Sequence, residues 1–208
     1  MRRLVVSPHP DDAVWSCGGI LHAWAARGDD VVVCTVFDAD GARRQEDADA
    51  LGLLSVRVRS LRIPEAAERG FYPGPLSRRR GIHAEDRGTV ETVAEALLPQ
   101  LSDADVVLLP RAERTHVDHL IARLAGERVA ATLGTELSYY PEFPYSAPLG
   151  APARVHRVDF RPWLRAGLAY RSQVDGMFGG PVRFTRALAR HARTPGGHCV
   201  WREIPGVS

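Results

Sequence analysis

The chain has 208 residues, a length that suits one α/β domain with a single sizeable core. Basic and acidic side chains nearly balance, at 27 and 25, so the charge does not require a nucleic acid or another polyanion as partner. All 27 residues in the Lys and Arg class are Arg, and the sequence also contains no Asn. Lys and Asn have A/T-rich codons, so this bias is typical of a GC-rich bacterial genome. We therefore interpret the run 78–80 as a solvated loop.

The cysteines and the apolar stretches indicate where the protein acts. Cys17, Cys34 and Cys199 are far apart and form no C-x-x-C pair, which favours a reducing compartment. The apolar stretch after Met1 is too short for a signal peptide, and no stretch approaches the about 20 apolar residues of a membrane span. We expect a cytoplasmic protein without a membrane or nucleic-acid partner, and the sequence leaves its oligomeric state open.

The first 61 residues alternate between strand and helix patterns. Residues 4–6 and 31–37 are apolar runs typical of buried parallel strands, and residues 56–61 alternate as a third strand. The intervening segments 14–27 and 42–54 have the patterns of helices. This βαβαβ order predicts a Rossmann-like, doubly wound, mostly parallel sheet.

The rest of the chain continues the pattern less regularly. Residues 64–87 are rich in Pro, Gly and Arg and predict a long loop over the carboxyl edge of the sheet. The remaining expected elements are helices at 89–101, 117–132, 162–173 and 182–192, and strands at 105–109, 137–140, 155–160 and 199–204. We predict one domain over residues 1–208, with a core at 3–145 and a C-terminal elaboration at 146–208.

Two polar motifs directly follow predicted strands. His9-Pro10-Asp11-Asp12 follows the first strand, and His116-Val117-Asp118-His119 follows the fourth. The strand order of such sheets reverses between these two strands, so the motifs are expected to face one another in the crevice. Two histidines and one carboxylate with an open fourth position are typical of a catalytic metal site.

The spacing suggests a division of labour among these side chains. Either Asp11 or Asp12 can join the histidines as a ligand, and His116 and His119 are expected on one face of the first helical turn. Asp11 beside a metal-bound water and His116 on the other flank would supply acid and base for amide or ester hydrolysis. Asp118 could orient one histidine as an acceptor.

Residues 7–19, together with His116 to His119, resemble the LmbE-like, or PIG-L, family of zinc-dependent N-deacetylases. Segments 43–47, 140–145 and 169–173 agree more loosely. The resemblance implies His9, Asp12 and His119 as zinc ligands, Asp11 as general base, and His116 as oxyanion stabiliser or general acid. Two positions depart from the family pattern. Many members have Glu at the position of Ala13, and many have a segment with Gly or Asn before the second motif, where this chain has residues 111–115.

The resemblance implies a metal-dependent hydrolase that removes an acyl group, most often acetyl, from an amino sugar or glycoconjugate. Metal-bound water would attack the amide with Asp11 as base. Zn²⁺ is the expected metal, with Fe²⁺ as the other choice. An amidase of a thiol-sugar conjugate is the alternative within the family. A non-catalytic metal-binding module and an Fe(II) oxygenase are the alternatives from other classes.

Other residues invite weaker interpretations. The His9 motif on its own could be a helix N-cap. Gly18-Gly19 lacks the G-x-G-x-x-G pattern of a dinucleotide site. Trp15 follows the first motif closely enough to wall a pocket, and His198 could reach the site from a turn. Four aromatic residues are expected at the mouth of the site, where they would suit a sugar or an aryl group: Phe71, Tyr72, Tyr140 and Tyr145.

Overall fold

Residues 1–38, 40–112, 116–144, 152 and 154–202 are described by the computed structural model. Within them, five parallel strands form one sheet in the order β3-β2-β1-β4-β5. This order confirms the predicted Rossmann-like, doubly wound fold. The strands are β1 (Arg2–Ser7), β2 (Asp30–Phe37), β3 (Arg57–Ile63), β4 (Val106–Pro110) and β5 (Glu136–Tyr140).

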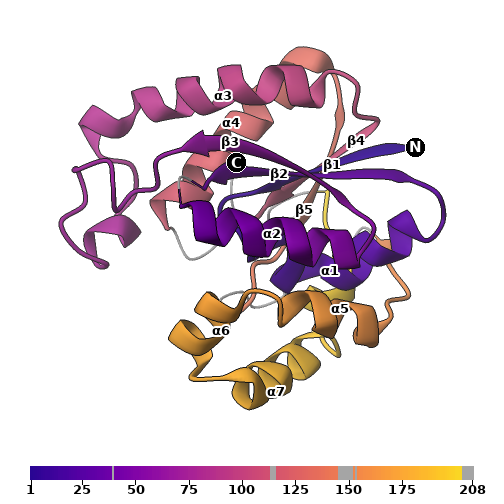
Figure 1. The fold of residues 1–208 in the computed structure, drawn as a ribbon. Coiled ribbons are helices and arrows are strands. Elements are labelled where there is room, and N and C mark those ends of the chain that lie inside the picture. Colours follow the sequence, from indigo (N-terminus) through magenta and orange to yellow (C-terminus); the bar gives the residue numbers. More distant parts are fainter. Residues whose placement is uncertain (39, 113–115, 145–151, 153, 203–208) are drawn as a thin grey trace.

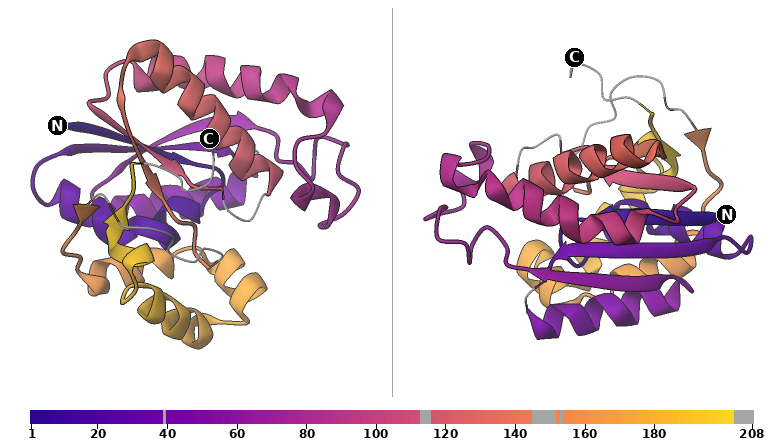
Figure 2. Two further views of the ribbon diagram at one scale, coloured as in Figure 1. Left: turned by 180° about the vertical axis from the view of Figure 1, so that it is seen from behind. Right: turned by 90° about the horizontal axis from the view of Figure 1, so that it is seen from above.

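Helices cover both faces of the sheet, as Figures 1 and 2 show. Side chains alternate between the faces, so Val5 packs toward the first pair of helices and Leu4 and Val6 pack toward the second pair. Burial on both sides explains why these strands are apolar throughout. The first pair is α1 (Asp12–Ala25) and α2 (Gly41–Leu53), and the second pair is α3 (Gly88–Leu101) and α4 (Val117–Leu133).

The C-terminal part adds a further layer against α1, on the side away from the sheet (Figure 1). The single helix predicted at 162–173 is wrong, since two helices separated by a turn occupy this region. The strand predicted at 155–160 is also wrong in extent, because most of that segment precedes or begins a helix. The elements are β6 (Arg154–Val155), α5 (Phe160–Gly167), α6 (Arg171–Phe178), α7 (Pro181–His191), α8 (Pro195–His198) and β7 (Cys199–Val200).

The two short strands pair with each other in an antiparallel arrangement outside the main sheet. The strand predicted at 199–204 is therefore confirmed only for its first residues, and Ile204 lies outside the described residues. The boundary expected between residues 145 and 146 also lies outside them and stays a prediction.

Two indole groups fasten the C-terminal layer to α1. Trp163 donates to the backbone oxygen of Val14 at 2.6 Å, and Trp15 donates to the backbone oxygen of Gly167 at 3.0 Å. A Cβ atom on Gly18 would lie only 2.5 Å from the Trp163 ring. The glycine pair therefore permits close packing of α1 against α5.

The sheet reverses its order at β1, which lies between β2 and β4. The carboxyl ends of β1 and β4 consequently lie side by side, and each leads into one of the two polar motifs. The loop at 64–87 projects at the same end and contains two short 3-10 turns, η1 (Ser77–Arg79) and η2 (Ala84–Asp86). Among the described residues, every helix is too short or too polar to cross a bilayer.

Candidate metal centre and catalytic site

The first motif forms the sharp turn between β1 and α1. The Ser7 hydroxyl donates to the backbone oxygen of His9 at 2.7 Å and accepts from the Ala13 backbone N–H at 3.1 Å, which fixes the turn. Asp11 has a positive φ of 91°, a conformation that costs a non-glycine residue about 1–3 kcal/mol. Asp11 occupies the N-cap position of α1, but its side chain makes no capping hydrogen bond there. Asp12 is the first helical residue and accepts from the His9 backbone N–H at 2.9 Å.

The second motif begins α4. His116 has an extended conformation and is the N-cap of the helix, one residue before the first turn in which it was predicted. Its Nδ1 atom accepts from the backbone N–H of Asp118 at 3.4 Å. The rings of His116 and His119 lie 5.5 Å and 5.3 Å from the ring of His9, measured between centroids. The two motifs, more than a hundred residues apart, therefore meet as expected.

Three side chains converge as a candidate ligand set. Nδ1 of His9 lies 3.1 Å from Oδ2 of Asp12, and Nε2 of His119 lies 3.3 Å from the same oxygen. Ligand atoms of a tetrahedral Zn²⁺ site, each about 2.0–2.2 Å from the ion, are separated by roughly 3.3–3.5 Å. All three residues are buried, and their ligand atoms lie within 4.8 Å of one another. The donor set thus fits a divalent metal of the Zn²⁺ or Fe²⁺ type.

A second cluster of possible ligands shares His9 and adds His116 and Asp118. It is the poorer candidate, because both Asp118 oxygens have partners already. Oδ1 pairs with the Arg69 guanidinium at 2.8 Å, and Oδ2 accepts from the backbone N–H of Ala66 at 3.0 Å. A metal in this cluster would lie beside a buried cation, so we favour the set formed by His9, Asp12 and His119.

Two carboxylates lie behind the histidines. Oδ2 of Asp118 is 2.9 Å from Nε2 of His9, and Oε1 of Glu142 is 3.0 Å from Nδ1 of His119. Each carboxylate accepts a hydrogen bond from one ring N–H and leaves the other ring nitrogen to face Asp12. Glu142 was not singled out from the sequence, although it follows β5 at the same edge of the sheet. It also accepts from the backbone N–H of Ala112 at 2.8 Å.

Charges in the site are strongly coupled. Burial disfavours a charged His9 ring, but hydrogen bonds with Asp118 and Asp12 outweigh that effect and raise the pKa of His9 to about 10. Burial also opposes ionisation of Asp12, yet the charge of His119 and the hydrogen bond with His9 lower its pKa to about 2. Without a metal, the centre is thus an ion-paired cluster, and metal binding must displace a proton.

The two flanking groups have different environments. Burial, followed by the charge of Asp12, raises the pKa of Asp11 well above its usual value. Burial, followed by the charge of His9, lowers the pKa of His116 to about 4. The His116 ring is therefore neutral near pH 7. Since its Nδ1 atom accepts a hydrogen bond, its Nε2 atom carries the proton.

The loop at 64–87 is tied to the centre through Arg69. This guanidinium bridges Asp118 and Asp86, each at 2.8 Å. The Tyr72 hydroxyl donates to the same Asp86 carboxylate at 2.8 Å. The loop is thereby held by buried ion pairs of Arg69, one of them to Asp118, the same residue that contacts His9.

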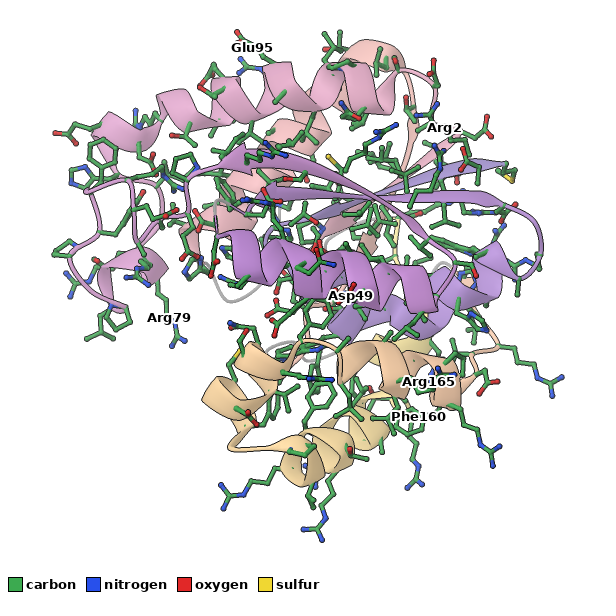
Figure 3. All side chains as sticks on the ribbon, in the orientation of Figure 1. Arg2, Asp49, Arg79, Glu95, Phe160 and Arg165 are labelled. Atoms are coloured by element: carbon green, nitrogen blue, oxygen red, sulfur yellow. The ribbon has the colours of Figure 1, made fainter. Side chains whose placement is uncertain are left out.

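An open cavity of about 160 Å³ lies over the centre. Trp15 forms part of its wall, as expected. In Figure 3 the labelled Arg79 extends from the 64–87 loop in the direction of α6, which contributes Gln173 and Met177. The other lining residues are His9, Asp11, Asp12, Arg43, Ala112, His116, His119, Glu142 and Phe143.

Several aromatic and histidine residues lie elsewhere than expected. Tyr72 and Tyr140 are buried in the packing of the fold, and Phe71 stacks on His83, so none of the three lines the cavity. Tyr145 lies outside the described residues. His198 is also absent from the lining and contacts the backbone oxygen of Ala192 instead.

The chain is similar to known N-deacetylases in sequence and in fold. The family model described as PIG-L: GlcNAc-PI de-N-acetylase matches residues 4–130. A 2'-N-acetylparomamine deacetylase of Streptomyces fradiae is 32% identical over 196 residues, covering 84% of this chain and 67% of the relative. The crystal structure of a zinc-inhibited form of teicoplanin deacetylase has a TM-score of 0.76 at 25% identity, with 99% of this chain and 100% of that chain covered. The A40926 pseudoaglycone deacetylase has a TM-score of 0.73 at 25% identity, with 100% and 98% covered.

Proposed function

Because the chain belongs to the PIG-L: GlcNAc-PI de-N-acetylase family, we propose that it removes the acetyl group from an N-acetylated amino sugar with the help of a divalent metal. The predicted enzyme class, a metal-dependent N-deacetylase, is confirmed by this membership and by the related deacetylases. One observation supports the proposal most directly: His9, His119 and Asp12 converge next to Asp11. Each of the two histidines is also hydrogen-bonded to a carboxylate.

His9, Asp12 and His119 would hold the metal, with Zn²⁺ as the proposed ion and Fe²⁺ as the alternative. A metal held there supplies a Lewis acid that acidifies water and polarises the amide carbonyl. Asp118 and Glu142 keep the two imidazole rings in the tautomer and orientation that ligation requires.

Asp11 is the proposed general base. Its carboxyl group lines the cavity next to Asp12 and lies 3.9 Å from the Arg43 guanidinium. Burial and the neighbouring Asp12 charge raise its pKa, and a raised pKa makes a carboxylate a stronger acceptor for the proton of attacking water. The same carboxyl group can then return the proton to the leaving amine.

His116 is the proposed oxyanion stabiliser. Its ring lines the same cavity as Asp11 and is neutral, with the proton on Nε2. A neutral imidazole can donate a hydrogen bond from its Nε2–H group to a developing oxyanion. The backbone N–H of Asp118 donates to Nδ1 of His116 and so orients the ring for this role.

The substrate class follows from the relatives and the cavity. The relatives are named as deacetylases of 2'-N-acetylparomamine, teicoplanin and the A40926 pseudoaglycone, so we propose a small N-acylated amino sugar or glycoconjugate as the substrate. Trp15 and Phe143 offer apolar faces for a sugar ring, and Arg43, Arg79 and Gln173 offer polar groups for its substituents. An amidase of a thiol-sugar conjugate is the second candidate within the family. A cytoplasmic location stays a prediction.

The test is acetate release by the purified, metal-loaded protein from 2'-N-acetylparomamine, N-acetylglucosamine and an N-acylated thiol-sugar conjugate. We expect acetate from at least one of the first two substrates. Cleavage of the thiol conjugate alone would transfer the assignment to the amidase. A full complement of metal with no hydrolysis of any substrate would contradict the proposed reaction.

A further inference from the structure

Arg69 connects the metal centre to the 64–87 loop, and its side chain is only 7% exposed. Nε and Nη2 donate to the Asp86 carboxylate at 2.9 Å and 2.8 Å. Nη1 donates to the backbone oxygen of Pro64 at 2.9 Å and lies 2.8 Å from Oδ1 of Asp118. The planar guanidinium therefore holds the start of the loop, its end and α4 in one fixed arrangement.

Asp118 is the second group that the loop and the metal centre share. Its Oδ2 atom lies 2.9 Å from Nε2 of His9 and accepts from the backbone N–H of Ala66 at 3.0 Å. The side chain has no exposed surface, so protein groups and not bulk solvent satisfy the carboxylate. A shift of the loop at Ala66 or Arg69 would therefore move the carboxylate that orients a proposed metal ligand.

The rest of the loop is joined to Arg69 through Asp86. The Tyr72 hydroxyl donates to Asp86 at 2.8 Å and accepts from the backbone N–H of His83 at 3.0 Å. Thr89, in the first turn of α3, donates its hydroxyl to the same carboxylate at 2.6 Å. Residues 64–87 are all described and, apart from η1 and η2, contain no helix or strand. These side-chain contacts therefore provide much of the order of the loop.

The loop also reaches the substrate side of the centre. Arg79 of η1 is among the residues that line the cavity, while Arg69 is not. One segment thus contacts the carboxylate behind His9 near its start and forms part of the cavity wall farther along. The shared carboxylate can therefore link metal binding to the order of this wall.

We propose that Arg69 is a positioning residue that couples the metal centre to the 64–87 loop. It holds Asp118 against His9, and a metal held at His9 steadies the loop through the same two residues. Such coupling is reciprocal: the factor by which an ordered loop raises metal affinity is the factor by which the metal favours the ordered loop. The inference rests on the proposed function only in taking His9 as a metal ligand.

Arg69→Lys tests the geometry of this connection separately from its charge. The variant keeps a positive charge beside Asp118, but one ammonium group cannot reproduce the planar fork that joins Asp86, Pro64 and Asp118. A change in metal affinity therefore reports the position of Asp118 and not the loss of a nearby cation.

Arg3→Lys is the matched control. The Arg3 side chain is also 7% exposed, pairs with Asp29 at 2.6 Å and lies over the Trp24 ring at 4.6 Å. It lies near the start of β1, at the amino end of the sheet, whereas the metal centre follows the carboxyl end. Both substitutions make the same chemical change in a buried ion pair, but Arg69→Lys alters a contact of Asp118.

The first measurement is Zn²⁺ affinity, from competition with a chromophoric chelator. Direct partners of metal-ligating histidines contribute about 10- to 100-fold to affinity, so we expect Arg69→Lys, which acts one residue further out, to lose about three- to tenfold. Arg3→Lys should keep the wild-type affinity, whatever its loss of stability in urea. Wild-type affinity in Arg69→Lys would overturn the inference, as would equal losses in the two variants.

The second measurement uses trypsin, because Arg79 and Arg80 are exposed in the loop. Arg69→Lys leaves the number of trypsin sites unchanged, since trypsin cleaves after both residue types. Mass spectrometry follows cleavage in the loop with and without Zn²⁺, with Arg193 in the exposed turn after α7 as the internal reference. Zn²⁺ should slow cleavage in the loop more than at Arg193 in the wild type, and Arg69→Lys should lose most of this difference.

The wild type alone can refute the coupling. Zn²⁺ binding without any change in loop cleavage would overturn the inference, even if no variant folds. Full metal-dependent protection in Arg69→Lys would remove Arg69 from the coupling and would overturn it too. Turnover enters neither measurement, so coupled metal binding and loop protection without release of acetate would contradict the proposed function alone.

Discussion

Nε2 of His9 lies 2.9 Å from Oδ2 of Asp118, although the two residues are 109 positions apart in the sequence. The contact joins the two motifs directly, one at the end of β1 and the other at the start of α4. It also leaves Nδ1 of His9 to face Asp12 and His119. We therefore interpret Asp118 as the group that prepares His9 for metal binding.

The variant Asp118→Asn tests this role. Arg69 requires an acceptor from residue 118, so the amide would turn its N–H group toward Nε2 of His9 and force the proton onto Nδ1. We expect metal affinity to fall about 10- to 100-fold in a competition titration with a chromophoric chelator. The control is Asp86→Asn, which disturbs Arg69 without touching His9. Equal losses in the two variants would show that the loop, and not the His9 contact, governs affinity.

A pair of variants should distinguish the metal ligands from the general base by their effects on metal content and turnover. Asp11→Ala is expected to keep the metal and to lose about 10²- to 10⁴-fold in kcat, because only a proton acceptor is removed. His119→Ala is expected to lose both metal and turnover, because a ligand is removed. Elemental analysis beside acetate release makes the comparison. Equal metal loss in both variants would contradict this division of roles.

His191 gives the fold a pH dependence. Burial lowers the pKa of His191 to about 4, so between pH 4 and 6.5 the folded state binds fewer protons than the unfolded state. Stability is therefore complete above about pH 6.5 and is lost as the pH falls, by up to about 1.4 kcal/mol per unit. His191→Gln keeps a donor for the backbone oxygen of Ser16 and does not titrate. Urea unfolding at pH 7, 6 and 5 should show a steeper loss for the wild type, and parallel curves would refute the assignment.

Gly18 should tolerate no larger side chain. A Cβ atom there would lie 2.5 Å from the buried Trp163 ring, so Gly18→Ala is expected to destabilise the protein by about 1–3 kcal/mol. Gly52→Ala is the control, because no atom lies within 4 Å of a Cβ at that helical position, and it should stabilise by about 0.5–1 kcal/mol. Thermal unfolding distinguishes the two, and a neutral Gly18→Ala would show that the helices can separate at no cost.

The sequence predicted the sheet and its first four helices well, because strands buried on both faces are apolar throughout and helices between them are forced by parallel pairing. The C-terminal layer was predicted less well. Asp159 caps α5 by accepting from the backbone N–H of Arg161 at 3.0 Å, so the segment expected to be a strand begins a helix. The expected helix at 162–173 breaks before Tyr170, whose ring and hydroxyl satisfy long-range contacts with Trp15 and Asp47.

The meeting of the two motifs was predictable because both directly follow strands whose ends must meet. The choice of Asp12 over Asp11 as a ligand came from the family resemblance, since the spacing allows either. Of the two supporting carboxylates, Asp118 was expected from the sequence to orient a histidine, and it contacts His9 at 2.9 Å. Glu142 was not expected, since its contact with His119 is recognised only when the two side chains are seen buried together.

The aromatic residues of the loops were misjudged for a similar reason. Tyr72 lies in a Pro- and Gly-rich segment, which predicts an exposed loop. The residue is buried instead, because its hydroxyl group donates to the buried Asp86 carboxylate.

The most direct test of the central claim is metal analysis of the purified wild-type and Asp11→Ala proteins beside acetate release from 2'-N-acetylparomamine and N-acetylglucosamine. The account expects about one divalent ion per chain in both proteins and acetate from the wild type alone. Metal in both proteins with equal acetate release would contradict the role of Asp11. A wild type that holds metal but releases no acetate would contradict the proposed deacetylation of amino sugars.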